Sequence, residues 1–114
     1  MVKSSEFIKG YTEIIACALL SKGDDYIYNI VKTINEAGGG GICITNPSML
    51  MIMKKLSEEG KVTSYTVAGG KGVDKRYYAL TAKGREYYLS NRDDYILSLK
   101  NLINLVGGKD ETEN

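Results

Sequence analysis

Cationic side chains are concentrated in one segment of the chain, residues 54–85. This segment carries eight basic residues against three acidic ones, a net charge of +5, whereas the remainder carries seven basic and eleven acidic residues. Basic residues gathered on one part of a domain can neutralise nucleic-acid phosphates while the rest of the domain stays neutral or acidic. These charges could equally be solvated and share no partner. The secondary-structure elements that carry them must be known before one of these interpretations is chosen.

Side chains suited to catalysis or metal binding are scarce. The chain has no histidine and no Cys-x-x-Cys motif, which removes the usual zinc ligand sets and the Ser-His and Cys-His nucleophile pairs. No pattern supports carboxylate or lysine catalysis, so we expect no enzyme activity, no metal site and no cofactor. Cys17 and Cys43 lie in apolar patterns, and we expect two buried thiols.

Length and hydropathy indicate one small domain. The 114 residues are 43% hydrophobic and 25% charged, which is ordinary for a globular protein. The chain has neither a long apolar run nor a basic leader followed by an apolar stretch. We therefore expect no membrane span, no secretory signal and a cytoplasmic location.

The cationic segment begins on a predicted helix that starts near Thr45. Thr45 and Asn46 suit a helix N-cap, Pro47 suits the first turn, and Gly60 suits a left-handed C-terminal cap. Apolar residues recur there at three- and four-residue spacing, which predicts one buried face. The positions expected to be buried are Met49, Leu50, Ile52, Met53 and Leu56. Those left to face outward are Asn46, Ser48, Met51, Lys54 and Lys55.

Two runs rich in β-branched and aromatic residues follow, at 62–67 and 76–81, joined by a glycine-rich segment. They predict an antiparallel hairpin with a long tip. A helix, a hairpin and a further helix form the plan of a winged helix-turn-helix, in which one helix enters the DNA major groove and the hairpin lies beside it on the backbone. We therefore expect a mostly α fold with a small antiparallel β-hairpin.

Two further helices precede this unit. The first is expected over residues 6–20, with an inward stripe of Phe7, Ile8, Tyr11, Ile14, Ile15, Ala18 and Leu19. The second is expected to be capped by Asp24 or Asp25, with inward residues Tyr26, Ile27, Ile30, Val31 and Ile34. Gly38–Gly41 predicts a flexible connector, and Ile42–Ile44 predicts a short strand at the edge of the hairpin sheet.

A long final helix is expected at about 85–106. Its apolar positions step by four and three, a heptad-like stripe that favours a partner chain. The residues expected at a dimer interface are Tyr88, Tyr95, Ile96, Leu99, Leu102, Ile103 and Val106. The alternative is that the helix folds back on the first helix. We expect a mixture of the two kinds of contact, in which Tyr87, Tyr88 and Leu89 meet the first helix.

The chain as a whole is expected to have three parts: a DNA-binding domain (1–84), a dimerisation helix (85–106) and a flexible acidic tail (107–114).

Four segments of the chain have a distinctive sequence, namely Lys9–Tyr11, Asp25–Ile30, Met49–Gly60 and Lys75–Gly84. The most specific part is Arg-Tyr-Tyr-x-Leu-Thr-x-x-Gly at the end of the hairpin. Together these segments resemble the PadR-like transcriptional regulators, and the likeness extends from about Phe7 to Val106. The short length is similar to the subgroup that has a single C-terminal dimerisation helix.

The chain departs from this family pattern at three places. Ile27-Tyr28 stands where the family usually has Gly-Tyr, and Met49-Leu50 stands where a Leu-Tyr pair is common. Tyr95 takes the place of a tryptophan that some multidrug-sensing relatives carry. The resemblance implies a homodimeric winged-helix repressor whose two recognition helices enter successive major grooves of a pseudo-palindromic operator.

Roles for individual residues follow from these elements. Asn46 and Ser48, near the positive end of a helix, suit phosphate or base-edge hydrogen bonds, and Lys54 and Lys55 suit phosphates. On the hairpin, the candidates for DNA backbone or minor-groove contacts are Lys71, Lys75 and Arg76.

Tyrosine is abundant, at nine residues in 114. In the multidrug-sensing relatives the dimer encloses a flat apolar pore where an aromatic ligand stacks, so the resemblance implies a ligand pocket that would include Tyr11, Tyr88 and Tyr95. A small aromatic inducer bound there would reorient the recognition helices. The alternative is that these tyrosines only pack the interface.

Two other functions stay open. One is a plasmid or phage DNA-segregation (centromere-binding) adaptor that coats repeated sites and recruits a partner protein through the acidic tail. The other is a winged helix used only for protein contacts, which the basic hairpin disfavours.

Overall fold

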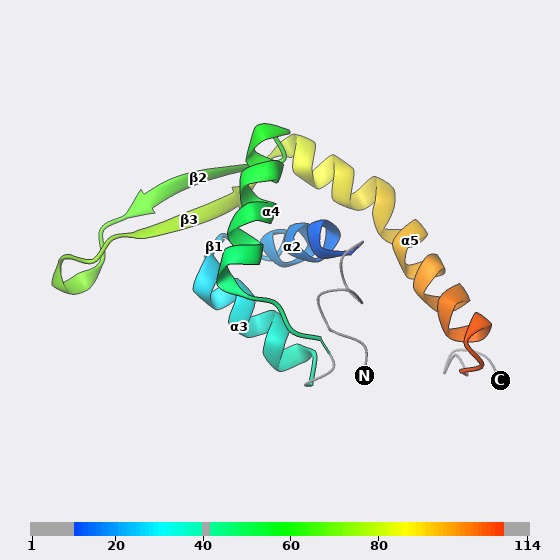
Figure 1. The fold of residues 1–114 in the computed structure, drawn as a ribbon. Helices are drawn as coiled ribbons and strands as arrows, with labels where there is room; N and C mark the ends of the chain where they lie inside the picture. The colour runs from blue at the N-terminus through cyan, green and yellow to red at the C-terminus, as the bar shows by residue number, and fades with distance from the viewer. Residues whose placement is uncertain (1–10, 40–41, 109–114) are drawn as a thin grey trace.

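The computed structural model describes residues 11–39 and 42–108 (Figure 1). Phe7 and Ile8 of the expected first helix, Gly40-Gly41 of the expected connector and residues 109–114 of the expected tail lie outside this part. In chain order the elements are α2 (Thr12–Leu20), β1 (Asp25–Tyr26), α3 (Ile27–Ala37), α4 (Asn46–Glu58), β2 (Val62–Val67), a short 3-10 turn η1 (Gly70–Gly72), β3 (Lys75–Leu80) and α5 (Ala82–Leu105).

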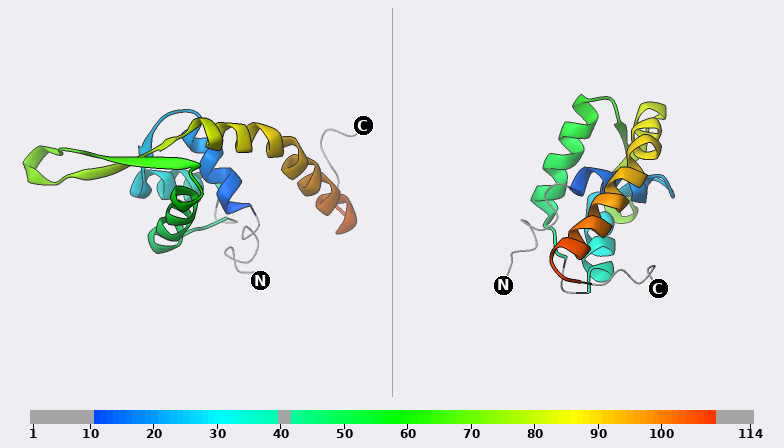
Figure 2. Two further views of the ribbon diagram at one scale, coloured as in Figure 1. Left: turned by 90° about the horizontal axis from the view of Figure 1, so that it is seen from above. Right: turned by 90° about the vertical axis from the view of Figure 1, so that its right-hand side faces the viewer.

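Helices α2, α3 and α4 form the body, and two long elements leave it on opposite sides. The β2–β3 hairpin extends one way and α5 the other, which gives the molecule extents of 53 × 31 × 23 Å (Figures 1 and 2). One apolar core joins the helices to the base of the hairpin. Its residues are Ala16, Cys17, Leu20, Ile30, Val31, Ile34, Ile44, Met49, Met53, Leu56, Val62 and Tyr78. The predicted winged helix-turn-helix with a long C-terminal helix is confirmed.

The sheet has three antiparallel strands in the order β1-β3-β2. The expected strand at Ile42–Ile44 is wrong, because Asp25–Tyr26 takes that edge of β3 instead. The amide of Asn35 holds the backbone of Ile44: Asn35 Nδ2 donates to the Ile44 carbonyl at 3.0 Å, and the Ile44 N–H donates to Asn35 Oδ1 at 2.7 Å. A side chain thus supplies the hydrogen bonds that a neighbouring strand would have given.

The expected cap of the second helix is also wrong. The backbone of Asp25 belongs to β1, so α3 begins only at Ile27, with Tyr26 in the capping position. The Asp25 carboxylate accepts the Tyr26 N–H at 2.9 Å and Asn29 Nδ2 at 2.7 Å. It therefore supports the turn between strand and helix from one residue before the cap.

Two helices bury part of the apolar stripe expected for each, including Ile14 of α2. In α2 the deepest residues are Ala16, Cys17 and Leu20, whereas Ile15, Ala18 and Leu19 are half-buried, because α2 packs against both α4 and α5. In α4 the fully buried residues are Met49, Met53 and Leu56. Leu50 is 53% exposed, so its predicted burial is wrong. It lies about 100° around the helix from Met49 and therefore faces away from the core.

The two cysteines differ in burial. Cys17 is buried in α2, and this burial raises the pKa of its thiol to about 11. Cys43 is exposed, which contradicts the prediction, since it lies in the irregular segment before α4.

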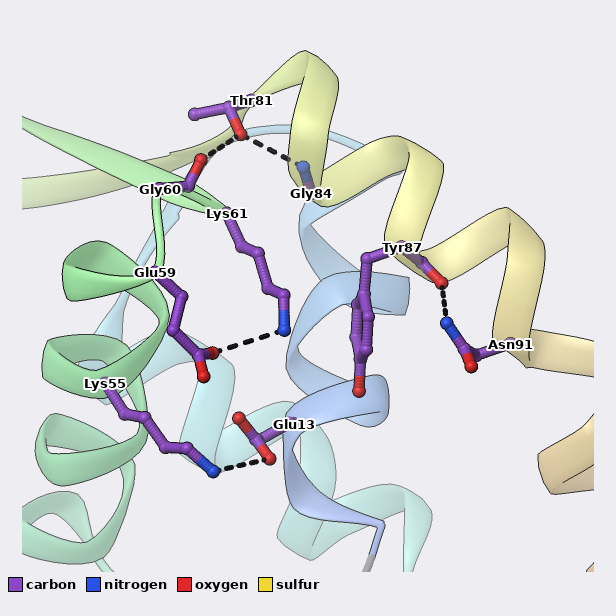
Figure 3. A network of polar contacts seen from close by, with 9 residues as sticks. All are labelled: Glu13, Lys55, Glu59, Gly60, Lys61, Thr81, Gly84, Tyr87 and Asn91. Atoms are coloured by element: carbon purple, nitrogen blue, oxygen red, sulfur yellow. Dashed lines mark hydrogen bonds and ion pairs between the residues drawn. The ribbon is translucent and has the colours of Figure 1, made fainter.

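The end of the hairpin is fixed to the start of α5 by Thr81 and Gly84 (Figure 3). Thr81 Oγ1 accepts the Gly84 N–H at 3.0 Å as the N-cap of α5, and it donates to the Gly60 carbonyl at 2.7 Å. A Cβ atom on Gly84 would collide with the carbonyl oxygen of Lys61. This is the physical reason for threonine and glycine at these two places of the family-like segment. Within the described residues, no helix is long and apolar enough to cross a membrane.

Candidate nucleic-acid interface and aromatic cavity

Helix α4 begins as its sequence predicts. Thr45 is the N-cap and accepts the Ser48 N–H at 3.2 Å, and Pro47 lies in the first turn. The Thr45 hydroxyl also donates to Ser48 Oγ at 2.9 Å. Asn46 and Ser48 are exposed at this positive helix end, where an anion would be stabilised.

The outward face of α4 and the base of the hairpin enclose a hollow of about 470 Å³. The hollow brings together Met51, Lys54 and Arg76, three of the residues selected from the sequence. Its other lining residues are Leu50, Ser57, Ser64 and Tyr78, which sequence reasoning missed. Alternation along β3 could have indicated Tyr78, because it lies two residues from Arg76 on the same face of the strand.

Lys55 lies apart from this hollow. Its Nζ atom is 3.1 Å from Glu13 Oε2 of α2, an exposed ion pair that ties the two helices (Figure 3). The hydrogen bond that Lys55 donates to Glu13 raises the pKa of Lys55. Lys54 and Lys55 are therefore different cations, one facing the hollow and one already paired.

The two cations of β3 point to opposite faces of the sheet. Arg76 borders the hollow, whereas Lys75 Nζ lies 4.4 Å from the centroid of the Tyr26 ring. Tyr26, Tyr77 and Tyr65 form a row across the three strands, with ring centroids 5.3 and 5.9 Å apart. This row stiffens the base of the hairpin and holds the Lys75 side chain against it.

Lys71 lies at the tip of the hairpin, farthest from the body. It has a φ of 65°, a left-handed conformation that is uncommon outside glycine, and its side chain is exposed. The candidate cations therefore occupy four places, namely the hollow, the ion pair with Glu13, the tyrosine row and the tip.

A second cavity, of about 290 Å³, lies between α2 and α5. It is lined by Tyr11, Tyr88 and Tyr95, the three residues of the expected ligand pocket, and the Tyr11 and Tyr95 rings meet edge to face at 5.4 Å. The remaining lining residues are Ile14, Ile15, Ala18, Ile42, Arg92, Ile96 and Leu99. Those from α2 belong to the stripe that the sequence suggested for the core.

Arg92 is the only charged residue among the described residues that line this cavity. Its guanidinium carbon is 5.8 Å from the Tyr88 ring centroid, and its Nε atom is 3.4 Å from Asp93 Oδ1. The hydrogen bond with Tyr88 and then that with Asp93 raise the pKa of Arg92. The cavity thus combines an apolar, tyrosine-rich wall with one exposed cation.

Tyr87 connects the cavity side of α5 with the end of α4 (Figure 3). Lys61 Nζ lies 3.9 Å from the Tyr87 ring centroid and 3.2 Å from Glu59 Oε1. Burial, and then the Tyr95 hydroxyl, raise the pKa of Tyr87. Contacts of Tyr87 with Tyr95 and Lys61, and of Lys61 with Glu59, therefore link α5 to the end of α4.

The C-terminal half of α5 leaves apolar side chains uncovered. Tyr88, Tyr95 and Leu99 of the expected interface are half-buried at the cavity, whereas Ile96, Leu102, Ile103 and Val106 are exposed. Leu97 and Leu105 are also exposed and were not selected from the sequence. Leu89, expected against the first helix, is exposed and lines a shallow groove with Arg85 and Glu86.

Over residues 11–39 and 42–108, no three cysteine, aspartate or glutamate side chains lie in an arrangement that could hold a metal ion.

Solved structures of similar fold cover most of the chain. A transcriptional regulator from Clostridium thermocellum is 31% identical, with a TM-score of 0.75 over 90% of this chain and 96% of that one. A PadR family transcription regulator from Clostridium difficile has a TM-score of 0.71 at 23% identity, over 86% and 99%. PadR of Bacillus subtilis, in complex with operator DNA, is 26% identical with a TM-score of 0.65, over 70% of this chain and 45% of that one.

Among curated proteins, no match to this chain was found. The family model of the transcriptional regulator PadR-like family matches residues 17–90, from α2 to the first half of α5. This span includes the capped helix α4, the three-stranded sheet and the Thr81–Gly84 junction. The chain belongs to the PadR-like family of DNA-binding transcriptional regulators.

Proposed function

We propose that the protein is a homodimeric repressor that binds a pseudo-palindromic operator through α4 and the hairpin. The observation that carries this proposal is the hollow between α4 and β3, which places Lys54 and Arg76 beside the outward face of a helix that is capped and exposed at its positive end. In such an arrangement α4 enters the major groove, and the two cations take phosphates of the adjoining backbone.

The charge distribution supports DNA as the partner. The net charge of +5 in residues 54–85 lies on α4, the hairpin and the start of α5. Lys71 at the exposed tip extends this charge along the DNA backbone beyond the reach of α4. The Bacillus subtilis relative was solved with operator DNA, which supports the same use of the fold here.

The exposed apolar residues of α5 support the dimer. Leu102 and Ile103 are each 41% exposed and Val106 is 74% exposed, on a helix that extends beyond the body of the subunit (Figure 2). Apolar side chains at heptad-like spacing are covered when two such helices pack together. Pairing of α5 helices would also set two copies of α4 at a fixed spacing, as a two-fold symmetric operator requires.

Release of the repressor by a small aromatic ligand is supported by the cavity between α2 and α5. Its tyrosines offer stacking surfaces, and Arg92 offers a cation for an anionic substituent. Titration with a planar cationic dye and with an aromatic carboxylate of similar size tests this proposal. A change in tyrosine fluorescence together with weaker DNA binding supports an inducer site. No change with either probe would show that the tyrosines only pack the interface.

Selection of genomic fragments by the purified protein at moderate salt, followed by footprinting, tests the repressor. The proposal expects one inverted repeat that overlaps a promoter, and lower transcription of a reporter from that promoter when the protein is present. A cluster of direct repeats covered cooperatively would instead indicate the segregation adaptor. Failure to enrich any fragment would contradict operator binding.

A further inference from the structure

Two large apolar side chains stand next to each other on the outward face of α4. Leu50 is 53% exposed and Met51 is 66% exposed, in the second turn of the helix. The helix fills the core with Met49, Met53 and Leu56, so Leu50 and Met51 lie outside the core. Neighbouring exposed apolar residues rimmed by polar side chains are typical of a contact surface for another molecule.

The surroundings of this pair define the chemistry of that molecule. Lys54 follows Leu50 by one helical turn, and Arg76 lies across the hollow that all four residues line. The hydroxyl-bearing residues Ser57, Ser64 and Tyr78 complete the lining. The partner must therefore be apolar where it meets Leu50 and Met51 and negatively charged around that point.

The major groove of DNA has this combination. Its walls are phosphates, and the C5-methyl group of thymine is the apolar group that its base edges present. Residues in the N-terminal part of a recognition helix are those that reach base edges. We infer that Leu50 and Met51 cover thymine methyl groups in each half-site, while Lys54 and Arg76 hold the neighbouring phosphates. This inference rests on the proposed operator binding by α4.

The pair would then determine sequence preference. An apolar side chain packed on a methyl group favours thymine over cytosine at the same position, because cytosine lacks the methyl group and presents an amino donor that an apolar side chain leaves unpaired. An acidic protein surface is the other occupant to consider. It could satisfy the two cations, but it would show no dependence on a methyl group of DNA.

Deoxyuridine substitution tests the inference directly. Each thymine of the selected operator is replaced in turn by deoxyuridine, which removes the methyl group and keeps the base pairing. We expect affinity to fall about fourfold for each covered methyl group, and about fifteenfold when the symmetric positions of both half-sites are changed. Thymines outside the contact should show no effect.

Side-chain variants then locate the contact. In Leu50→Ala and Met51→Ala, affinity for the thymine operator falls, and the penalty of deoxyuridine at the contacted position shrinks towards zero. Val73→Ala is the matched control, since Val73 is an apolar residue of similar exposure (64%) near the hairpin tip. It should keep the full penalty. All three residues are exposed, so thermal unfolding should match that of the wild type.

The outcomes separate this inference from the proposed function. Normal operator binding with no effect of deoxyuridine at any position would overturn the inference and leave operator binding in place. An undiminished penalty in both Leu50→Ala and Met51→Ala would also overturn it, because other groups would then contact the methyl. Failure of the wild type to bind any selected DNA would contradict both proposals.

Discussion

Two regions of the molecule expose large apolar side chains, and their surroundings differ. On α4, Leu50 and Met51 share a hollow with Lys54 and Arg76, in a segment of net charge +5. On the C-terminal half of α5, Leu102 and Ile103 lie in a stretch, residues 92–106, where two basic and two acidic residues balance.

Exposure alone therefore does not identify a partner, whereas exposure combined with local charge indicates the chemistry that a partner would have. An apolar pair framed by cations suits a polyanion with apolar groups in its groove. An apolar stripe in neutral surroundings suits a second copy of the same helix. We therefore propose DNA as the partner of the first region and a second subunit as the partner of the second.

The largest expected effect comes from a charge in the α5 stripe. Leu102→Asp would bury an unpaired carboxylate at the proposed dimer interface, and we expect dimerisation to weaken by roughly 3 kcal/mol or more, about 150-fold or more in the dissociation constant. Analytical ultracentrifugation measures this change. Leu97→Asp is the control, because Leu97 is an exposed leucine that lies about 140° around the same helix. Equal effects of the two variants would contradict the assigned stripe.

The next largest effect is expected at the Thr81–Gly84 junction, where the hairpin meets the start of α5. Gly84→Ala would drive a methyl group against the Lys61 carbonyl, so we expect the free energy of unfolding to fall by about 2 kcal/mol in urea denaturation. Gly70→Ala at the hairpin tip should change it little, because no described atom lies within 4 Å of the added Cβ. An unchanged stability of Gly84→Ala would show that the backbone at the junction can shift to make room for the added methyl group.

The two adjacent lysines of α4 allow the effect on DNA binding to be compared within one helix. Lys54→Ala should weaken DNA binding roughly tenfold, because it removes a charge aimed at a phosphate. Lys55→Ala should weaken it less, because Lys55 is already paired with Glu13. Fluorescence anisotropy with a labelled operator measures both affinities. A larger loss in Lys55→Ala would mean that the ion pair with Glu13 opens on DNA.

The smallest effect is expected at the hairpin tip. Lys71→Ala should weaken binding to operator and random DNA alike, and the slope of log affinity against log salt should fall in magnitude by about one. Salt titrations with both DNAs measure the slope. A loss confined to the operator would show that Lys71 reads sequence.

Regular local patterns allowed most of the fold to be predicted. Thr45, Pro47 and Gly60 mark the ends of α4 through local hydrogen bonding and backbone conformation, and the structure follows them. Ile42–Ile44 and Asp25 were misjudged because their roles depend on distant partners: Asn35 for the first and the edge of β3 for the second. Such pairings leave no local signal.

The residue types of the site could be predicted from the sequence, but the directions in which their side chains point could be predicted less well. Cations at positions 54, 55, 75 and 76 were visible, but their separation into different faces depends on Glu13 and on the tyrosine row. Leu50 was assigned to the core because an apolar residue beside a helical stripe looks like part of it. Only packing shows that Met49 and Met53 already fill that space.

Oxidative footprinting of side chains, with and without operator DNA, tests the comparison most directly. We expect Leu102, Ile103 and Val106 to be protected in the free protein, because the proposed dimer covers them. We expect Met51 to be oxidised in the free protein and protected only on DNA. Met49 and Met53, both fully buried, should stay unmodified throughout and serve as internal controls. A Met51 that stays reactive on DNA would contradict DNA binding by this face of α4, and an α5 stripe that is reactive in the free protein would contradict the proposed dimer.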